Sequence, residues 1–102
     1  MADVVTEALR TQLVLGDLSE EAVSDRLGIG RRKLQRVLKT EDTSFREIRE
    51  RFFAARARAL LGEPNLTIQE IARSLGYSEV NSFRRAFRTW TGLSPSAYRS
   101  SP

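Results

Sequence analysis

The chain of 102 residues contains no cysteine and no histidine. Their absence removes disulfide bonds, thiolate nucleophiles, the commonest metal ligand and the commonest general base. No apolar run approaches the roughly 18 residues of a membrane span, and the first ten residues include two acids and no cationic leader segment. We therefore predict a cytoplasmic protein that does not contact membranes, is not an enzyme, and has no catalytic residue, metal site or cofactor.

Positive charge is what the sequence does have, and it is unevenly distributed. The formal net charge is only +4, but residues 31–39 hold five cations and residues 84–99 hold four, with no acid in either stretch. Most of the cations are arginine, which suits bidentate recognition of phosphate or guanine better than lysine does. Genome composition alone could explain the preference for arginine, so the clustering is the more informative signal.

The apolar residues are spaced as in helices nearly everywhere, and no stretch alternates as a strand would. We predict an all-α fold of about seven helices in a single domain spanning residues 1–102. Its parts are a first subdomain over about 1–44, a long linker helix over about 45–61, and a second subdomain over about 66–100. In the linker helix, Phe45, Ile48, Phe52, Ala55 and Ala59 share one stripe.

Capping residues mark where several of these helices begin. Ser19, Ser78 and Ser94 each precede a predicted helix, and Pro95 follows Ser94 at the first helical position. Thr67 has a glutamate three residues later, which predicts a capping box.

The sequence also repeats itself. Residues 18–49 align with residues 66–99 when one extra residue is allowed near 78–82 and another near 90. Leucines, a turn glycine, an arginine, a capping serine and a final arginine then recur in the same order. The aligned pairs are Leu18 with Leu66, Leu27 with Leu75, Gly28 with Gly76, Arg36 with Arg85, Ser44 with Ser94, and Arg49 with Arg99. We interpret this as a duplicated structural unit.

Each copy has the spacing of a helix-turn-helix. A small residue stands four positions before the turn glycine, Ser24 before Gly28 and Ala72 before Gly76. Two helices that cross steeply need a small side chain at their closest approach and a glycine at the turn. A single such spacing also occurs in plain helical hairpins, but here both copies are followed by a basic helix.

We predict that the second helix of each copy, over about residues 30–40 and 79–91, is a DNA-recognition helix. Helical spacing places polar side chains opposite the apolar stripe in each, and Arg, Gln and Asn are side chains that pair with base edges. The residues selected by this spacing are Arg32, Gln35, Arg36 and Lys39 in the first helix, and Asn81, Ser82, Arg85 and Arg88 in the second. For one basic helix, a solvated surface is the simpler interpretation; for two, DNA binding is favoured.

The second copy, "IQEIARSLGYSEVNSFRRAFRTWTGLSPSAYR", resembles the DNA-binding domain of AraC/XylS-type transcription regulators, and the resemblance covers essentially the whole chain. It implies two helix-turn-helix subdomains whose recognition helices enter adjacent major-groove segments of double-stranded DNA. The base-reading positions it implies are Arg31, Arg32, Gln35, Arg36, Val80, Asn81, Ser82 and Arg85. The implied location is cytoplasmic, associated with the nucleoid.

Further expectations concern the DNA backbone and its shape. Helix N-termini and cations beside the readers are expected to contact phosphates. The candidates are Ser19, Lys39, Thr67, Arg84, Arg88 and Ser94. A linker helix of about 25 Å is shorter than the roughly 34 Å between successive major-groove faces of straight B-DNA, so we expect the DNA to bend.

Two alternatives stay open from the sequence. The module could act mainly through protein contacts, with RNA polymerase or a partner regulator, and the resemblance allows polymerase contact in addition to DNA. An enzyme is the weakest alternative, because carboxylate pairs such as Glu47 and Glu50 lie on helix surfaces without a histidine, cysteine or phosphate loop. The resemblance also implies an effector-sensing or dimerising domain in a longer parent chain.

Overall fold

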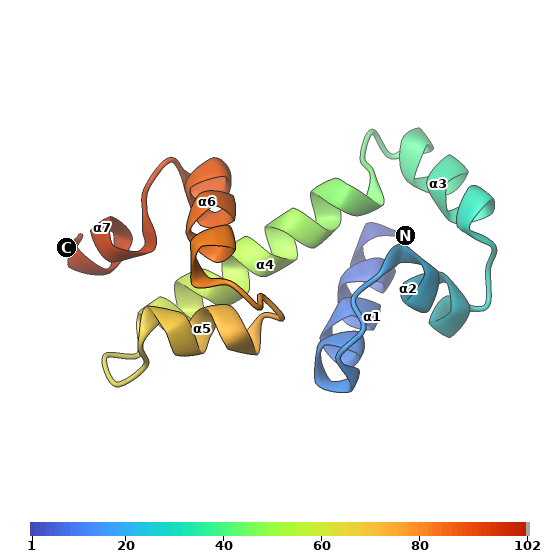
Figure 1. The fold of residues 1–102 in the computed structure, drawn as a ribbon. Helices are drawn as coiled ribbons and strands as arrows, with labels where there is room; N and C mark the ends of the chain where they lie inside the picture. The colour runs from blue at the N-terminus through green and yellow to red at the C-terminus, as the bar shows by residue number, and fades with distance from the viewer. Residues whose placement is uncertain (102) are drawn as a thin grey trace. The chain divides into compact units, whose positions relative to one another are not determined.

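A computed structural model describes residues 1–101, and all regular structure in that range is helical (Figure 1). The chain forms two compact units, the first over residues 1–52 and the second from Phe53 onward, and helix α4 runs through both. The helices are α1 (Ala2–Leu15), α2 (Glu20–Leu27), α3 (Arg31–Thr40), α4 (Phe45–Leu61), α5 (Ile68–Ser74), α6 (Val80–Thr91) and α7 (Pro95–Ser100). The predicted all-α class with seven helices is confirmed.

The first unit has a core of aliphatic side chains from three helices. Val5 and Leu9 of α1, Val23 of α2, and Leu34 and Leu38 of α3 are all completely buried. Burial of each such side chain contributes about 1.5–3 kcal/mol to folding. Because α3 buries its leucines here, its orientation within the unit is fixed by the core and its opposite face is left to solvent.

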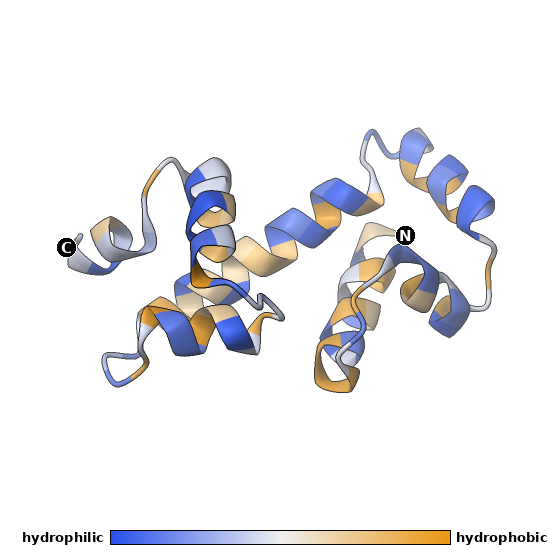
Figure 2. Cartoon of the chain, in the orientation of Figure 1, coloured by the Kyte–Doolittle hydropathy of each residue, from blue (hydrophilic) through white to orange (hydrophobic). Residues whose placement is uncertain are grey.

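The core of the second unit is aromatic. Phe83 and Phe87 of α6 are completely buried, and the Phe87 ring meets Tyr98 edge-on with centroids 5.6 Å apart. Phe53 of α4 stacks on Trp90, with centroids 6.1 Å apart. Figure 2 shows the result on α6, where hydrophobic and hydrophilic residues occupy different faces of the helix.

Both units use the same turn between their first and second repeat helices. Gly28 and Gly76 adopt left-handed φ angles of 70° and 91°, which favour glycine. The backbone N–H of the residue after each glycine donates to the carbonyl oxygen of the small residue five positions earlier: Ile29 to Ser24 at 3.2 Å, and Tyr77 to Ala72 at 3.0 Å. The duplication seen in the sequence is therefore a duplication of backbone geometry.

The predicted caps at Ser19, Thr67 and Ser94 are confirmed, each side-chain oxygen accepting a backbone N–H three residues later. Glu70 completes the capping box by accepting the Thr67 N–H at 3.1 Å. Hydrogen bonds from the Thr67 backbone, and secondarily its side chain, lower the pKa of Glu70. The stability that the Glu70 carboxylate contributes to the capping box is present at neutral pH, and it is lost as the pH falls through that lowered pKa.

Two details of the predicted helices are wrong. Ala55 and Ala59 are exposed, and α4 instead buries Phe53, Ala54, Ala57 and Leu61 beyond Phe52. The buried face shifts because this part of α4 packs into the second unit, not the first. The residue before α6 is Glu79, and it provides no side-chain cap, so Ser78 does not cap that helix.

The buried Ser24 hydroxyl supports a stability prediction. Only 2% of Ser24 is exposed, and within the described residues its Oγ has no hydrogen-bond partner. Ser24→Ala should therefore raise the free energy of unfolding by about 1 kcal/mol in urea denaturation. The reciprocal Ala72→Ser places a hydroxyl at the equivalent buried position and should lower it by about 1 kcal/mol or more. A loss of stability in Ser24→Ala would mean that the hydroxyl is satisfied after all.

Candidate nucleic-acid interface

Helix α3 presents a continuous polar surface. Leu34 and Leu38 point into the core, while the residues predicted to contact DNA are exposed. Four of them line one hollow of about 540 Å³: Arg32, Gln35, Arg36 and Lys39. Figure 2 shows α3 as hydrophilic along most of its length. The structure therefore brings together the four α3 residues that helical spacing selected.

Arg31 and Gln35 share a partner outside α3 that the sequence did not reveal. Nε of Arg31 donates to Oε1 of Glu20 at 3.1 Å, and Nη2 of Arg31 forms an ion pair with the same oxygen at 3.0 Å. Nε2 of Gln35 also donates to that oxygen, at 3.1 Å. Glu20 is the first residue of α2, where an acid is also explained by the helix dipole. The hydrogen bonds of Glu20 to α3 form across the turn between the two helices, and the local sequence gives no indication of such contacts.

Helix α6 presents a smaller polar surface. Asn81, Arg85 and Arg88 are exposed, whereas Val80 and Ser82 are half-buried. Nη1 of Arg84 donates to Oδ1 of Asn81 at 3.0 Å, and because arginine only donates, the Asn81 amide nitrogen is left facing away from it. Arg84, predicted as a phosphate contact, therefore also orients a predicted base reader.

The two predicted recognition helices differ in the contacts that they receive from the preceding helix. Aligning the repeats puts Ile68 of α5 where α2 has Glu20. Ile68 is half-buried and has no polar group to offer α6. The α3 surface is thus held by a carboxylate from its neighbour, whereas the hydrogen bond on α6 is internal to the helix.

The capping residues predicted to contact phosphate have their oxygens engaged. Ser19, Thr67 and Ser94 each accept a backbone N–H at 3.0–3.1 Å. A hydroxyl that accepts in this way keeps its own proton, which remains available to donate to a phosphate oxygen.

Arg99 has a structural partner inside the second unit. Its Nε donates to the carbonyl oxygen of Leu61 at 3.2 Å and its Nη2 to that of Glu63 at 3.3 Å. These bonds satisfy carbonyls at the end of α4 and just beyond it. One of the cations in the basic stretch 84–99 is thereby used to hold α7 against the end of α4.

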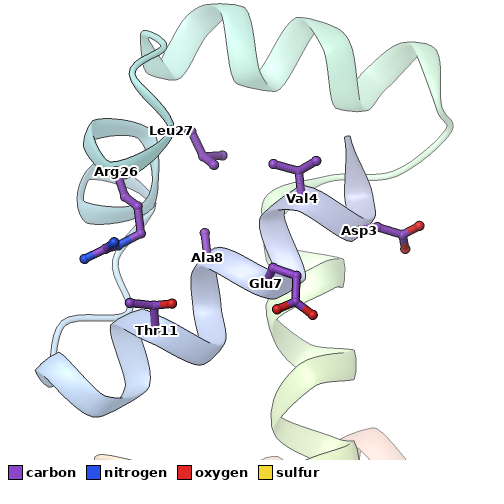
Figure 3. Close-up of a pocket in the computed structure, with 7 residues that line it drawn as sticks. All are labelled: Asp3, Val4, Glu7, Ala8, Thr11, Arg26 and Leu27. Atoms are coloured by element: carbon purple, nitrogen blue, oxygen red, sulfur yellow. The ribbon is translucent and has the colours of Figure 1, made fainter.

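A second hollow in the first unit has a different character. It has a volume of about 440 Å³ and is lined by α1 and the end of α2, with Val4, Ala8 and Leu27 as its apolar part (Figure 3). Asp3 and Glu7 line its α1 side and Arg26 its α2 side, so its charged groups are of both signs, unlike the cationic lining of the α3 hollow. Among residues 1–101, no cluster of three or more histidine, cysteine or acidic side chains has the arrangement of a metal site.

None of the helices within residues 1–101 combines the length and the hydropathy needed to cross a membrane.

Comparisons with known proteins agree with this arrangement of helices. A family model described as a helix-turn-helix domain matches residues 23–101. The transcriptional regulator VirS of Mycobacterium tuberculosis is 36% identical over 99 residues, which are 97% of this chain and 29% of VirS. VqsM of Pseudomonas aeruginosa, also named as a transcriptional regulator, is 40% identical over 75 residues, covering 74% of this chain and 23% of VqsM. The chain thus spans less than a third of the curated relatives it matches.

Solved structures give the same result. The regulator CdpR from Pseudomonas aeruginosa aligns with a TM-score of 0.77 and 41% identity, over 81% of this chain and 26% of CdpR. The C-terminal domain of AraT, a response regulator from Geobacillus stearothermophilus, aligns with a TM-score of 0.78 and 31% identity, over 94% of this chain and 83% of that domain. The chain therefore belongs to the AraC/XylS family of helix-turn-helix domains, which bind DNA in transcription regulation.

Proposed function

We propose that the chain binds double-stranded DNA sequence-specifically, with α3 and α6 in adjacent major-groove segments. The observation that carries this proposal is that each unit buries one face of its second repeat helix in its own core and exposes arginine and amide side chains opposite. A helix held in this way presents base-reading groups without having to unfold or rotate. The alternative, a module that acts mainly through protein contacts, does not require those groups.

On α3 we propose Arg31, Arg32, Gln35 and Arg36 as base readers. All four are exposed on a helix that the buried leucines hold in place. Arginine can donate two hydrogen bonds to guanine, and glutamine can pair with adenine, each worth about 1–3 kcal/mol of discrimination. Three arginines and one glutamine favour a half-site rich in guanine with one adenine.

On α6 we propose Val80, Asn81, Ser82 and Arg85. Arg85 suits guanine, and Val80 suits a thymine methyl group. Because Oδ1 of Asn81 accepts from Arg84, its amide nitrogen is the group best placed to donate to a base acceptor. Val80 and Ser82 are half-buried, so we expect this half-site to be the less tightly specified of the two.

Phosphate contacts are proposed for Lys39, Arg84 and Arg88 beside the readers, and for the caps Ser19, Thr67 and Ser94. The three cations are exposed. At Ser19, Glu20 and Glu21 follow in the first turn of α2 and oppose a phosphate there, so this contact should be weaker than that of Lys39.

Lys39→Ala tests the phosphate assignment. We expect it to weaken binding to the preferred duplex and to a random duplex alike, because phosphate contacts carry no sequence information. The slope of log affinity against log salt should become shallower by about 0.9. Fluorescence anisotropy over a salt series measures both quantities. Lys33→Ala is the matched control: Lys33 is exposed on the same helix but does not line the α3 hollow, so it should change the slope less.

The same titration separates DNA binding from the protein-contact alternative. Affinity for a defined duplex that exceeds affinity for random DNA at physiological salt supports the proposal. Equal, salt-sensitive affinity for both duplexes would favour a module that acts through RNA polymerase or a partner regulator.

We further propose that the complex bends its DNA. The α4 helix that connects the units has 17 residues, or about 25 Å at about 1.5 Å per residue. Neighbouring major-groove segments on one face of straight B-DNA are about 34 Å apart. Bending costs a few kcal/mol by elastic estimates, on the order of what added contacts return. A phasing assay should show position-dependent mobility; straight DNA with both half-sites footprinted would contradict the proposal.

A further inference from the structure

We propose that Glu20 is a specificity-determining residue: from α2 it positions Arg31 and Gln35 for base reading, although it is not itself a reader. The inference rests on the proposed function of α3. It starts from one carboxylate oxygen, Oε1, which accepts a hydrogen bond from each of the two side chains at 3.1 Å.

Burial suits Glu20 to this role. The Glu20 side chain is 19% exposed, whereas the Arg31 side chain is 57% exposed. The carboxylate is therefore partly shielded from solvent, which strengthens its hydrogen bonds, while much of the guanidinium remains accessible. A base-reading side chain that is held in this way loses less conformational entropy when it binds DNA.

The donors that Glu20 occupies are not those that base recognition needs. It accepts the Nε hydrogen of Arg31 and lies in ion-pair contact with Nη2 on the same edge of the guanidinium, which leaves Nη1 and the outward Nη2 hydrogen for an end-on pair to guanine. A carboxylate only accepts, so it fixes the Gln35 amide with the nitrogen toward Glu20. Oε1 and the second Nε2 hydrogen of Gln35 remain, and these are the groups that match adenine.

The repeat provides an internal comparison. The position equivalent to Glu20 in the second unit is Ile68, which cannot hold a reader by hydrogen bonding. The effect of Glu20 should therefore be confined to the half-site that α3 reads. Base pairs assigned to α6 should not respond to its replacement.

The test measures relative affinities of the whole chain for a set of duplexes in which each base pair of the preferred site is varied. Arg31→Ala and Gln35→Ala first identify the base pairs that those side chains read. Glu20→Ala should lower discrimination at those same base pairs about fivefold to tenfold, a fraction of what a full bidentate pair supplies. Discrimination at base pairs read by Arg32 and Arg36 should not change.

Glu21→Ala is the matched control. Glu21 follows Glu20 in the first turn of α2, has the same charge, and within residues 1–101 makes no hydrogen bond or ion pair to α3 in the structure. Both alanine variants remove one negative charge near the DNA and should raise the affinity for all sequences equally. Only the ratio of affinities between duplexes therefore distinguishes Glu20→Ala from Glu21→Ala.

Glu20→Asp, compared with Glu21→Asp as its control, keeps the charge and the favourable acid at the start of α2 but withdraws the carboxylate by one methylene. It should lose discrimination as Glu20→Ala does, and it covers the case in which the alanine variant does not fold.

Two results would overturn this inference without affecting the proposed function. In the first, Arg31→Ala and Gln35→Ala alter discrimination between duplexes, but the Glu20 variants discriminate as their Glu21 controls do. In the second, the Glu20 variants discriminate between duplexes better than the wild type does. Adding Glu20→Ala to the Arg31→Ala/Gln35→Ala background should cause no further loss, because the side chains it positions are gone. If neither Arg31→Ala nor Gln35→Ala changes discrimination at any base pair, the proposed function of α3 fails, and this inference with it.

Discussion

Replacing Arg32, Gln35 and Arg36 together by alanine is expected to lower affinity for the preferred duplex by about 100-fold or more, bringing it close to the affinity for random DNA. Each residue as a base reader supplies about 1–3 kcal/mol of discrimination, and losses at neighbouring contacts do not simply add. All three side chains are exposed and line the α3 hollow, so their removal leaves the core of the first unit intact. Competition binding against preferred and random duplexes measures the loss.

The matched control for that variant is Arg46→Ala with Arg51→Ala. It removes the same number of cations from exposed positions on α4, where both arginines form ion pairs with glutamates one turn away. We expect this control to lower affinity for both duplexes by similar factors, without changing their ratio. If the control changes the ratio as much as the triple variant does, the discrimination does not come from the α3 side chains.

Phe87→Ala is expected to destabilise the second unit by about 3–5 kcal/mol, the usual cost of removing a buried phenylalanine. The ring is completely buried and contacts three other aromatic rings: Phe83, Trp90 and Tyr98. Domains of this size have a total stability of about 5–15 kcal/mol, so a large part of the second unit should unfold on mild heating. Loss of ordered α6 should also remove discrimination at its half-site.

Trp90 provides the measurement, because it is the only tryptophan in the sequence and lies in the second unit. Its fluorescence during urea denaturation reports on that unit alone. Arg88→Ala is the control, since Arg88 is the exposed neighbour of Phe87 and its removal should cost less than about 0.5 kcal/mol. A Phe87→Ala midpoint close to that of Arg88→Ala would mean that the aromatic cluster is not the core of this unit.

The features predicted correctly from the sequence are those with local causes. Ser19, Thr67 and Ser94 cap helices because an oxygen there bonds to an N–H only three residues away. The two turn glycines adopt positive φ, as the helix-turn-helix spacing requires. The spacing of Arg32, Gln35, Arg36 and Lys39 was enough to place them on one surface, because a helix fixes which residues share a face.

Apart from Ser78, which lies one residue too early to cap α6, the features that were missed or wrong depend on packing between elements. Ala55 and Ala59 continue the apolar stripe of α4, but their side chains are exposed because the helix passes from one unit into the next. The contact of Glu20 with Arg31 and Gln35 crosses a turn, and the acid already had a local explanation in the helix dipole. In the second unit, helical spacing places both Asn81 and Ser82 off the apolar stripe, but only Asn81 is exposed and Ser82 is half-buried.

Selection of bound sequences from a random duplex pool tests the central claim most directly. The wild-type chain should enrich a site with two clusters of preferred base pairs, one read by α3 and the other by α6. Gln35→Ala should lose the preference at one position of the first cluster, and Asn81→Ala at one position of the second, with the remaining preferences kept. A pool without enriched sequence, or uniform losses across all positions in both variants, would contradict the account.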